Sequence, residues 1–210
     1  LVNYDTTKAL VTPWQLLFYT DNAANASSIS QKDNSALPVV SQHADLRWSD
    51  DNRYLYYGRG VMPAVKDTSL LEDESVNVEI WRTDDPVLYT IQNVNKPADE
   101  KKSYTHVYDT QLIKHTTLHD PAWESIVFTR DRNSRYAVVY TEKPYQLGAT
   151  WLGDAAKDLA VVDIQTGKIT PFKKEMITNP RLSPGGKYVY GYSEVDTTWW
   201  VYQIVTGVFT

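Results

Sequence analysis

Ser193 is the residue whose type and setting come nearest to those of a catalytic nucleophile. It lies in the string Gly191-Tyr192-Ser193-Glu194-Val195. A serine hydrolase presents its nucleophile in a Gly-x-Ser-x-Gly elbow, because small residues allow the strained turn that exposes the hydroxyl. Here the fifth residue is Val195, the string continues a predicted strand, and no helical pattern follows. We therefore predict a serine at a strand end, not a nucleophile.

Four histidines are the other candidates for acid–base or metal chemistry: His43, His106, His115 and His119. No pair has a metal-ligand spacing such as His-x-x-x-His, and the chain has no cysteine to complete a zinc site. His119 precedes Asp120, but adjacent residues rarely face each other as members of a catalytic triad do. We predict surface or edge histidines.

Two acidic clusters offer clustered oxygen atoms, which calcium prefers. Asp50-Asp51-Asn52 is better explained as a hairpin turn. Glu72-Asp73-Glu74 lacks the alternating spacing and the glycine of a binding loop, so calcium is the minor alternative there. Trp81 and the pair Trp199-Trp200 are expected to pack within blades and not to form a ligand shelf. We predict no catalytic, metal-binding or cofactor-binding residue in this chain, and no cofactor.

Composition indicates a globular chain with many half-buried rings. Its 210 residues are 42% hydrophobic and 22% charged, with 15 Tyr and 7 Trp against 4 Phe. Tyrosine and tryptophan suit strands that pack a ring inward and leave a polar tip at the surface. The net charge of −5 gives no electrostatic footprint for nucleic acid, and no apolar run is long enough to span a membrane.

One motif recurs three times: strand, tight turn, basic residue, tyrosine, strand. Its copies are Leu46–Tyr57, Phe128–Tyr140 and Leu182–Tyr190. The turns contain the pairs Asp51-Asn52, Asn133-Ser134 and Gly185-Gly186, which tolerate the positive φ that two-residue hairpins require. Self-similarity over tens of residues, with strands in every copy, predicts a β-propeller.

A second type of hairpin follows the first. Leu159–Thr170 and Trp200–Phe209 each place a Thr-Gly turn between two strands, and Tyr104–Ile113 is a weaker copy without the glycine. We interpret these as the third and fourth strands of blades. The sequence thus predicts an all-β fold, a partial β-propeller of about three to four four-stranded blades. The expected bounds are a partial blade at 1–43 and blades at about 46–118, 123–172 and 177–210.

Other segments are expected to be strands of the partial blade or connections. Strands are predicted near Trp14–Thr20 and Leu37–Val40, and a loop at Asp21–Lys32. Val61–Ser75 is expected to be an inserted surface loop, and Asn93–Ser103 a polar linker or short helix. No long amphipathic helix is predicted, so we expect no α/β-hydrolase domain within these residues.

The order of these motifs resembles the N-terminal propeller of bacterial exported serine peptidases of the prolyl oligopeptidase family, which includes dipeptidyl-peptidase-like enzymes. The matching pieces are Trp48–Leu55, Val78–Pro86, Glu142–Tyr145, Asp163–Gly167, Leu182–Tyr188 and Trp199–Tyr202. In that family a propeller caps an α/β-hydrolase domain and admits short peptides but not folded proteins. No residue here matches a catalytic residue of the family.

The resemblance implies a middle portion of such a propeller, with no activity of its own. Its expected partners are a C-terminal hydrolase domain, the remaining blades, and the peptide substrates of the parent enzyme. It also implies export to the periplasm or the cell exterior. Self-association through open sheet edges is expected as well. The alternative is a stand-alone small propeller that acts as a binding or scaffold module for protein or glycan ligands.

Overall fold

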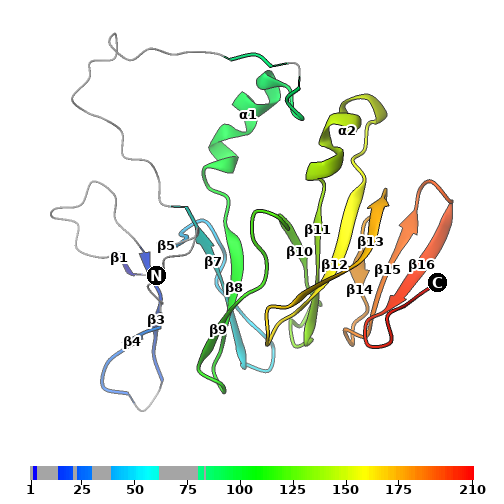
Figure 1. The fold of residues 1–210 in the computed structure, drawn as a ribbon. Coiled ribbons are helices and arrows are strands. Elements are labelled where there is room, and N and C mark those ends of the chain that lie inside the picture. Colours follow the sequence, from blue (N-terminus) through cyan, green and yellow to red (C-terminus); the bar gives the residue numbers. More distant parts are fainter. Residues whose placement is uncertain (1, 4–13, 21–22, 30–38, 62–79, 83) are drawn as a thin grey trace, which may run out of the picture. The chain divides into compact units, whose positions relative to one another are not determined.

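The computed structural model describes residues 2–3, 14–20, 23–29, 39–61, 80–82 and 84–210 (Figure 1). The chain divides into two compact units. Unit 1 comprises residues 1–44 and 59–103, and unit 2 comprises residues 45–58 and 104–210. The predicted loop at Val61–Ser75, with its Glu72-Asp73-Glu74 cluster, lies outside the described residues apart from Val61.

Unit 1 contains short strands and one helix. β2 (Trp14–Gln15) pairs with both β1 (Val2–Asn3) and β5 (Val39–Val40), and β5 pairs with Arg59 and Gly60 at the end of β7. β3 (Leu17–Phe18) forms a hairpin with β4 (Ser27–Ser28). The predicted strands at 14–20 and 37–40 therefore correspond to β2, β3 and β5. The predicted loop at 21–32 is wrong at β4, where two serines pair with apolar partners.

The helix α1 (Tyr89–Asp99) replaces the predicted linker or short helix at Asn93–Ser103, four residues earlier along the chain. It includes Pro97, and none of its residues is buried. The ring of Tyr89 lies 5.0 Å from that of Trp81. No helix of the described residues is long and apolar enough to cross a membrane.

Unit 2 consists of four strands of a larger antiparallel sheet and of two four-stranded antiparallel sheets, all of the propeller-blade type (Figure 1). Sheet I contains β6 (Arg47–Trp48), β7 (Tyr54–Gly60, of which 54–58 lie in this unit), β8 (Tyr104–Asp109) and β9 (Lys114–Thr117). Sheet II contains β10 (Ser125–Val127), β11 (Tyr136–Thr141), β12 (Lys157–Asp163) and β13 (Ile169–Met176). Sheet III contains β14 (Arg181–Leu182), β15 (Tyr188–Ser193), β16 (Thr198–Gln203) and β17 (Val208–Phe209). The fold is all-β, a partial β-propeller with no α/β-hydrolase architecture in the described residues.

The turn between the first and second strands has the same construction in sheets I and III. Ser49 N–H donates to Tyr54 O, and Ser183 N–H donates to Tyr188 O, both at 2.9 Å. The left-handed position falls on one residue of each predicted pair, Asn52 (φ 59°) and Gly186 (φ 63°). The prediction of a two-residue hairpin is wrong, because residues 50–53 and 184–187 lie between the paired positions.

In sheet II the corresponding turn is two residues longer, since Thr129 stands in the place of Ser49 and Tyr136 in that of Tyr54. Its positive φ falls on Arg132 (φ 55°), so the prediction of Asn133-Ser134 is wrong. The buried hydroxyl of Thr129 makes no hydrogen bond to the described residues.

Sheet II is buried on both faces because successive side chains on a strand point to opposite sides. Val139 and Ala160 pack in one cluster with Tyr54 and Tyr56 of sheet I. Val138, adjacent on the same strand, packs in a second cluster with the side chains of sheet III. Val138 and Val139 are both fully buried, so one strand stabilises two separate interfaces.

A short helical insertion joins β11 to β12. It consists of the 3-10 helix η1 (Lys143–Tyr145) and α2 (Gln146–Leu152). The Tyr145 hydroxyl donates to Asp158 Oδ1 at 2.7 Å. This hydrogen bond, with burial, raises the pKa of Tyr145 to about 12. Sequence reasoning found no helix here, although Pro144 at the start of η1 is a helix-start signal.

Candidate functional site

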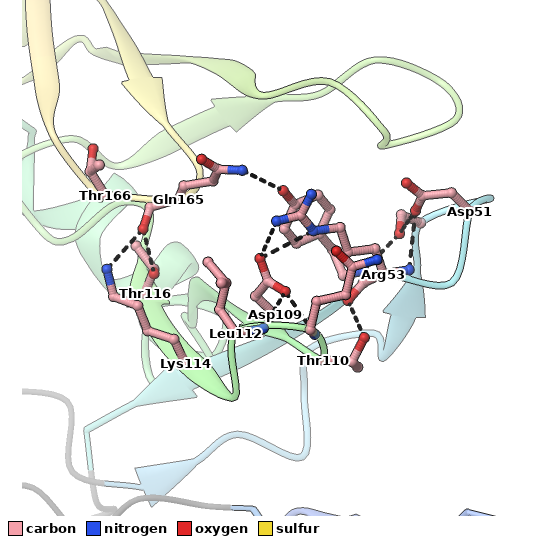
Figure 2. A network of polar contacts seen from close by, with 12 residues as sticks. Asp51, Arg53, Asp109, Thr110, Leu112, Lys114, Thr116, Gln165 and Thr166 are labelled. Carbon is pink, nitrogen blue, oxygen red and sulfur yellow. Dashed lines mark hydrogen bonds and ion pairs between the residues drawn. The ribbon is translucent and has the colours of Figure 1, made fainter.

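The basic residue of the recurring motif forms an ion pair with the aspartate that ends the third strand. Arg53 Nη2 lies 2.9 Å from Asp109 Oδ2 in sheet I (Figure 2). Arg135 Nη2 lies 2.8 Å from Asp163 Oδ2 in sheet II. These arginines follow the first turn of each sheet and the aspartates begin the last, so each ion pair fastens two hairpins together.

A backbone hydrogen bond accompanies the ion pair and recurs in all three sheets. Thr110 N–H donates to Arg53 O at 3.0 Å, and Ile164 N–H donates to Arg135 O at 2.9 Å. In sheet III, Ile204 N–H donates to Lys187 O at 3.1 Å. The backbone connection is therefore independent of the charges, which differ between the sheets.

Asp109 uses both of its carboxylate oxygens. Its Oδ1 accepts hydrogen bonds from the N–H groups of Gln111 (2.9 Å) and Leu112 (3.1 Å), while Oδ2 accepts from Arg53. Burial acts to raise the pKa of Asp109, but the hydrogen bonds from Arg53 and the two amides outweigh burial. The pKa of Asp109 therefore lies below its usual value.

Sheet III lacks the ion pair because Gln203 occupies the position of Asp163. Among the described residues no ion pair involves Lys187. The turn itself is retained, since Gly207 N–H donates to Gln203 O at 2.9 Å and Gly207 takes a φ of 71°.

The junction between sheets I and II is closed by Gln165 (Figure 2). Its Nε2 donates to the Tyr54 hydroxyl at 3.3 Å. Its backbone oxygen accepts hydrogen bonds from Lys114 Nζ at 2.9 Å and from Thr116 Oγ1 at 3.4 Å. One residue of sheet II is thus held by three side chains of sheet I.

The junction between sheets II and III instead contains a pocket of about 250 Å³. Its apolar lining consists of Tyr136, Val161, Tyr202, Ile204 and Val205. Its polar lining consists of Asp163, Lys168 and Thr170. Because Arg135 neutralises Asp163, the charge that Lys168 brings to this pocket is unbalanced. The pocket is a candidate binding site within the described residues.

Ser193, the sequence candidate for a nucleophile, has a structural role. It is buried, and its hydroxyl donates to Asp196 Oδ2 at 2.8 Å and accepts from Asp196 N–H at 3.2 Å. These hydrogen bonds stabilise the turn between β15 and β16. The predicted strand-end serine is confirmed.

The prediction of surface or edge histidines is wrong for His106 and His119, which are buried. The two ring nitrogens of His106 lie 3.1 Å from Tyr104 O and 3.0 Å from Thr117 Oγ1. The contact with Thr117 joins β8 to β9, whereas Tyr104 lies on the same strand as His106. Burial of these rings was not predictable from the chain positions alone, because the partners are supplied by neighbouring strands.

His119 can be assigned one tautomer. Its Nε2 accepts a hydrogen bond from Thr105 N–H at 2.9 Å. Its Nδ1 lies 2.9 Å from Trp123 O, which can only accept, so Nδ1 carries the proton. Asp120 instead accepts from the N–H of Ala122 at 2.8 Å. His119 and Asp120 therefore contact different partners, as expected for adjacent residues.

The remaining candidates have local structural contacts. Asp51 Oδ1 accepts from Arg53 N–H at 3.1 Å, which supports the hairpin interpretation of Asp50-Asp51-Asn52. Trp200 packs between sheets II and III as predicted, but the prediction is wrong for Trp199 and Trp81, which are 67% and 65% exposed. No group of three or more potential metal ligands occurs in the part of the chain that the structure describes.

No family model matches this chain, and no curated protein matches it. A crystal structure of TolB from Acinetobacter baumannii is similar to it with a TM-score of 0.37 and 10% identity, covering 93% of this chain and 36% of that one. A crystal structure of the tricorn protease is similar with a TM-score of 0.31 and 11% identity, covering 94% of this chain and 24% of that one. The chain spans well under half the length of either protein.

Proposed function

We propose that this chain is a non-catalytic propeller segment of an exported serine peptidase that cleaves peptides. Its role is to narrow the path by which substrates reach a separate hydrolase domain. The order of the sequence motifs supports the peptidase, and the outer face of sheet III supports the role of a segment within a larger propeller.

The outer face of sheet III is the face that points away from sheet II. It corresponds in the repeat to the face of sheet II that sheet III covers. Tyr190 lies two residues after the motif tyrosine of sheet III, as Val138 does in sheet II. Val201 lies two residues before the last turn of sheet III, as Val161 does in sheet II. Val138 and Val161 are covered by sheet III. The corresponding face of sheet III carries Tyr188, Tyr190, Tyr192, Trp199 and Val201, and all but the half-buried Tyr190 are exposed.

A sheet face of this composition is expected to pack against another apolar surface. The rings of Tyr192 and Trp199 already pack edge to face at 5.6 Å, so the surface is ordered for contact. A further blade that presents small or aliphatic residues, as Val139 and Ala160 do on the inward face of sheet II, has the required chemistry. Covering by successive blades would narrow the entrance to a hydrolase active site.

The use of Ser193 as a turn residue supports a non-catalytic role. Its hydroxyl is buried and committed to Asp196. A serine nucleophile needs a hydroxyl that a substrate can reach and a base that removes its proton. The catalytic serine of the proposed peptidase would therefore lie outside these residues.

The test uses the gene product that contains this chain. We expect it to hydrolyse short peptides, to spare folded proteins, and to be labelled by a serine-directed phosphonate at a residue other than Ser193. Trp199→Asp should increase cleavage of an unfolded protein relative to a short peptide, because it loosens the proposed contact with the next blade. Val195→Asp, at an exposed apolar residue in a turn, is the matched control.

Three results would each overturn the proposal. A phosphonate adduct on Ser193 would make this chain a hydrolase. Equal effects of Trp199→Asp and Val195→Asp on substrate selection would remove the gating role. Absence of peptide hydrolysis, together with binding of a protein or glycan that Trp199→Asp abolishes, would favour the stand-alone binding module.

A further inference from the structure

The two junctions of unit 2 are built on the same repeat and differ at one informative position. Asp163 and Gln203 each begin a turn whose fifth residue is a glycine, Gly167 or Gly207, with positive φ. Val205 therefore occupies in sheet III the position of Gln165 in sheet II. The side chain that closes one junction is absent from the other.

The groups that hold Gln165 have counterparts around the pocket. Tyr136 occupies the position of Tyr54 in the recurring motif. Lys168 and Thr170 follow Asp163 at the same offsets as Lys114 and Thr116 follow Asp109. All three counterparts line the pocket.

Of the contacts that Gln165 makes, only the one to Tyr54 uses its side chain, whereas Lys114 and Thr116 bond to its backbone oxygen. No hydrogen bond or ion pair within the described residues involves the Tyr136 hydroxyl or Lys168 Nζ. Val205 is exposed and its aliphatic side chain cannot donate or accept a hydrogen bond. The pocket thus combines an apolar floor with an unused hydroxyl and an unused ammonium.

We propose that this pocket binds a short aliphatic group that ends in a carboxamide or carboxylate, such as the side chain of glutamine or glutamate in a peptide. The methylene groups would lie on Val161 and Ile204, and the planar head would reach the Tyr136 hydroxyl. Lys168 favours the carboxylate, because Asp163 is neutralised by Arg135. This inference does not depend on the proposed peptidase function.

The probes are the N-acetyl, N-methylamide derivatives of glutamine, glutamate and alanine, titrated into the isotope-labelled chain. We expect saturable shifts of the amide signals of Tyr136, Lys168 and Val205 with millimolar affinity for the first two probes. The alanine derivative should cause none. Lys168→Met should weaken binding of the glutamate probe about fivefold, the upper range for an exposed ion pair, and leave the glutamine probe unaffected.

Filling the pocket supplies the decisive variants. Val205→Gln should reproduce the closure made by Gln165, weaken both probes about tenfold and raise the melting temperature. Val205→Met, which fills the pocket without a carboxamide, serves as a second variant. In the opposite direction, Gln165→Val should open a new pocket beside Tyr54 that binds the glutamine probe.

The proposal fails if neither the glutamine nor the glutamate probe gives saturable shifts, or if the alanine derivative shifts the same signals. It also fails if both filling variants bind as the natural chain does. The melting temperature of each variant shows whether the chain is folded, so loss of binding in an unfolded variant is not counted as support.

Discussion

The junction between sheets I and II is closed by hydrogen bonds, whereas the junction between sheets II and III keeps a pocket. Both have an apolar interior, in which Val139 faces sheet I and Val138 faces sheet III. The first adds the contacts of Gln165, and the second has Val205 in that position. The comparison teaches that the repeat fixes the location of the polar groups, while the side chain at one position decides whether the motif tyrosine has a partner across the junction.

Burying a charge in either interior tests which junction is tighter. Val139→Asp and Val138→Asp place a carboxylate in an apolar cluster, so each should lower the free energy of unfolding by about 4 kcal/mol. We expect the larger loss for Val139→Asp, because the pocket gives the other junction access to water. Urea unfolding measures both values, and equal losses would mean that the pocket does not loosen its junction.

Removing the charge of Asp109 tests the ion pair that sheet III lacks. Asp109→Asn should lower the free energy of unfolding by about 2 kcal/mol at neutral pH, because hydrogen bonds that involve a charged group are lost. Asp163→Asn should have a smaller effect, since Arg135 is more exposed than Arg53. Unfolding by urea would contradict this expectation if the two losses were equal.

The lowered pKa of Asp109 predicts that the stability of the chain depends on pH. Its pKa in the folded chain lies below the unfolded value of about 3.9, so its stabilising effect is fully present above that value. The effect is lost as the pH falls from about 4 through the folded pKa. Melting temperatures measured from neutral to acidic pH should therefore fall less steeply for Asp109→Asn than for the natural chain.

The turns between the third and fourth strands of sheets I and II differ in the residue that adopts a positive φ. Ile113 has a φ of 50° in the position of Gly167, an unfavourable conformation for a β-branched residue. Ile113→Gly should raise the free energy of unfolding by about 1 kcal/mol. Ile113→Ala, which keeps a Cβ at the same φ, is the control and should stabilise less.

Replacing a glycine of these turns by alanine is expected to have different effects at the two junctions. A Cβ at Gly167 would lie 2.9 Å from Thr117 O in sheet I, whereas a Cβ at Gly207 would meet no atom closer than 3.9 Å. Both residues have positive φ, so Gly207→Ala measures the backbone cost alone. Thermal unfolding should show a larger loss for Gly167→Ala; equal losses would show that sheet I yields at this contact.

The smallest effect is expected from a substitution that restores the missing ion pair of sheet III. Gln203→Asp should let the carboxylate accept from the N–H groups of its own turn and pair with Lys187. We expect a gain of about 0.5 kcal/mol in the free energy of unfolding, reduced by added salt. Gln203→Asn, which can bond to the turn without a charge, is the control.

The sequence motifs predicted the strand-and-turn plan because its signals are local. Asn52 and Gly186 tolerate the left-handed conformation, and both adopt it. The turn of the second copy, Phe128–Tyr140, was misplaced because it is longer, so the positive φ moved to Arg132. A repeat can thus indicate that a turn exists without fixing which residue adopts the unusual conformation.

The candidate site was not predictable because it depends on contacts between sheets. Val205 and Gln165 look alike as exposed turn residues in the sequence, and only the packing of neighbouring sheets distinguishes them. The ion pairs carried a usable signal: a basic residue before each motif tyrosine and an aspartate four residues before Gly167. Buried His106 and His119 left no such signal, because their partners come from adjacent strands and loops.

The link between first and last turns also bears on errors during folding. A shift of β11 by two residues against β12 would keep its apolar side chains on the correct faces, so side-chain alternation alone cannot prevent it. The same shift would separate Arg135 from Asp163 and break the bond from Ile164 N–H to Arg135 O. In sheets I and II, a backbone hydrogen bond and an ion pair therefore both disfavour this misalignment. Sheet III keeps only the backbone part, and misaligned strands should survive longest there.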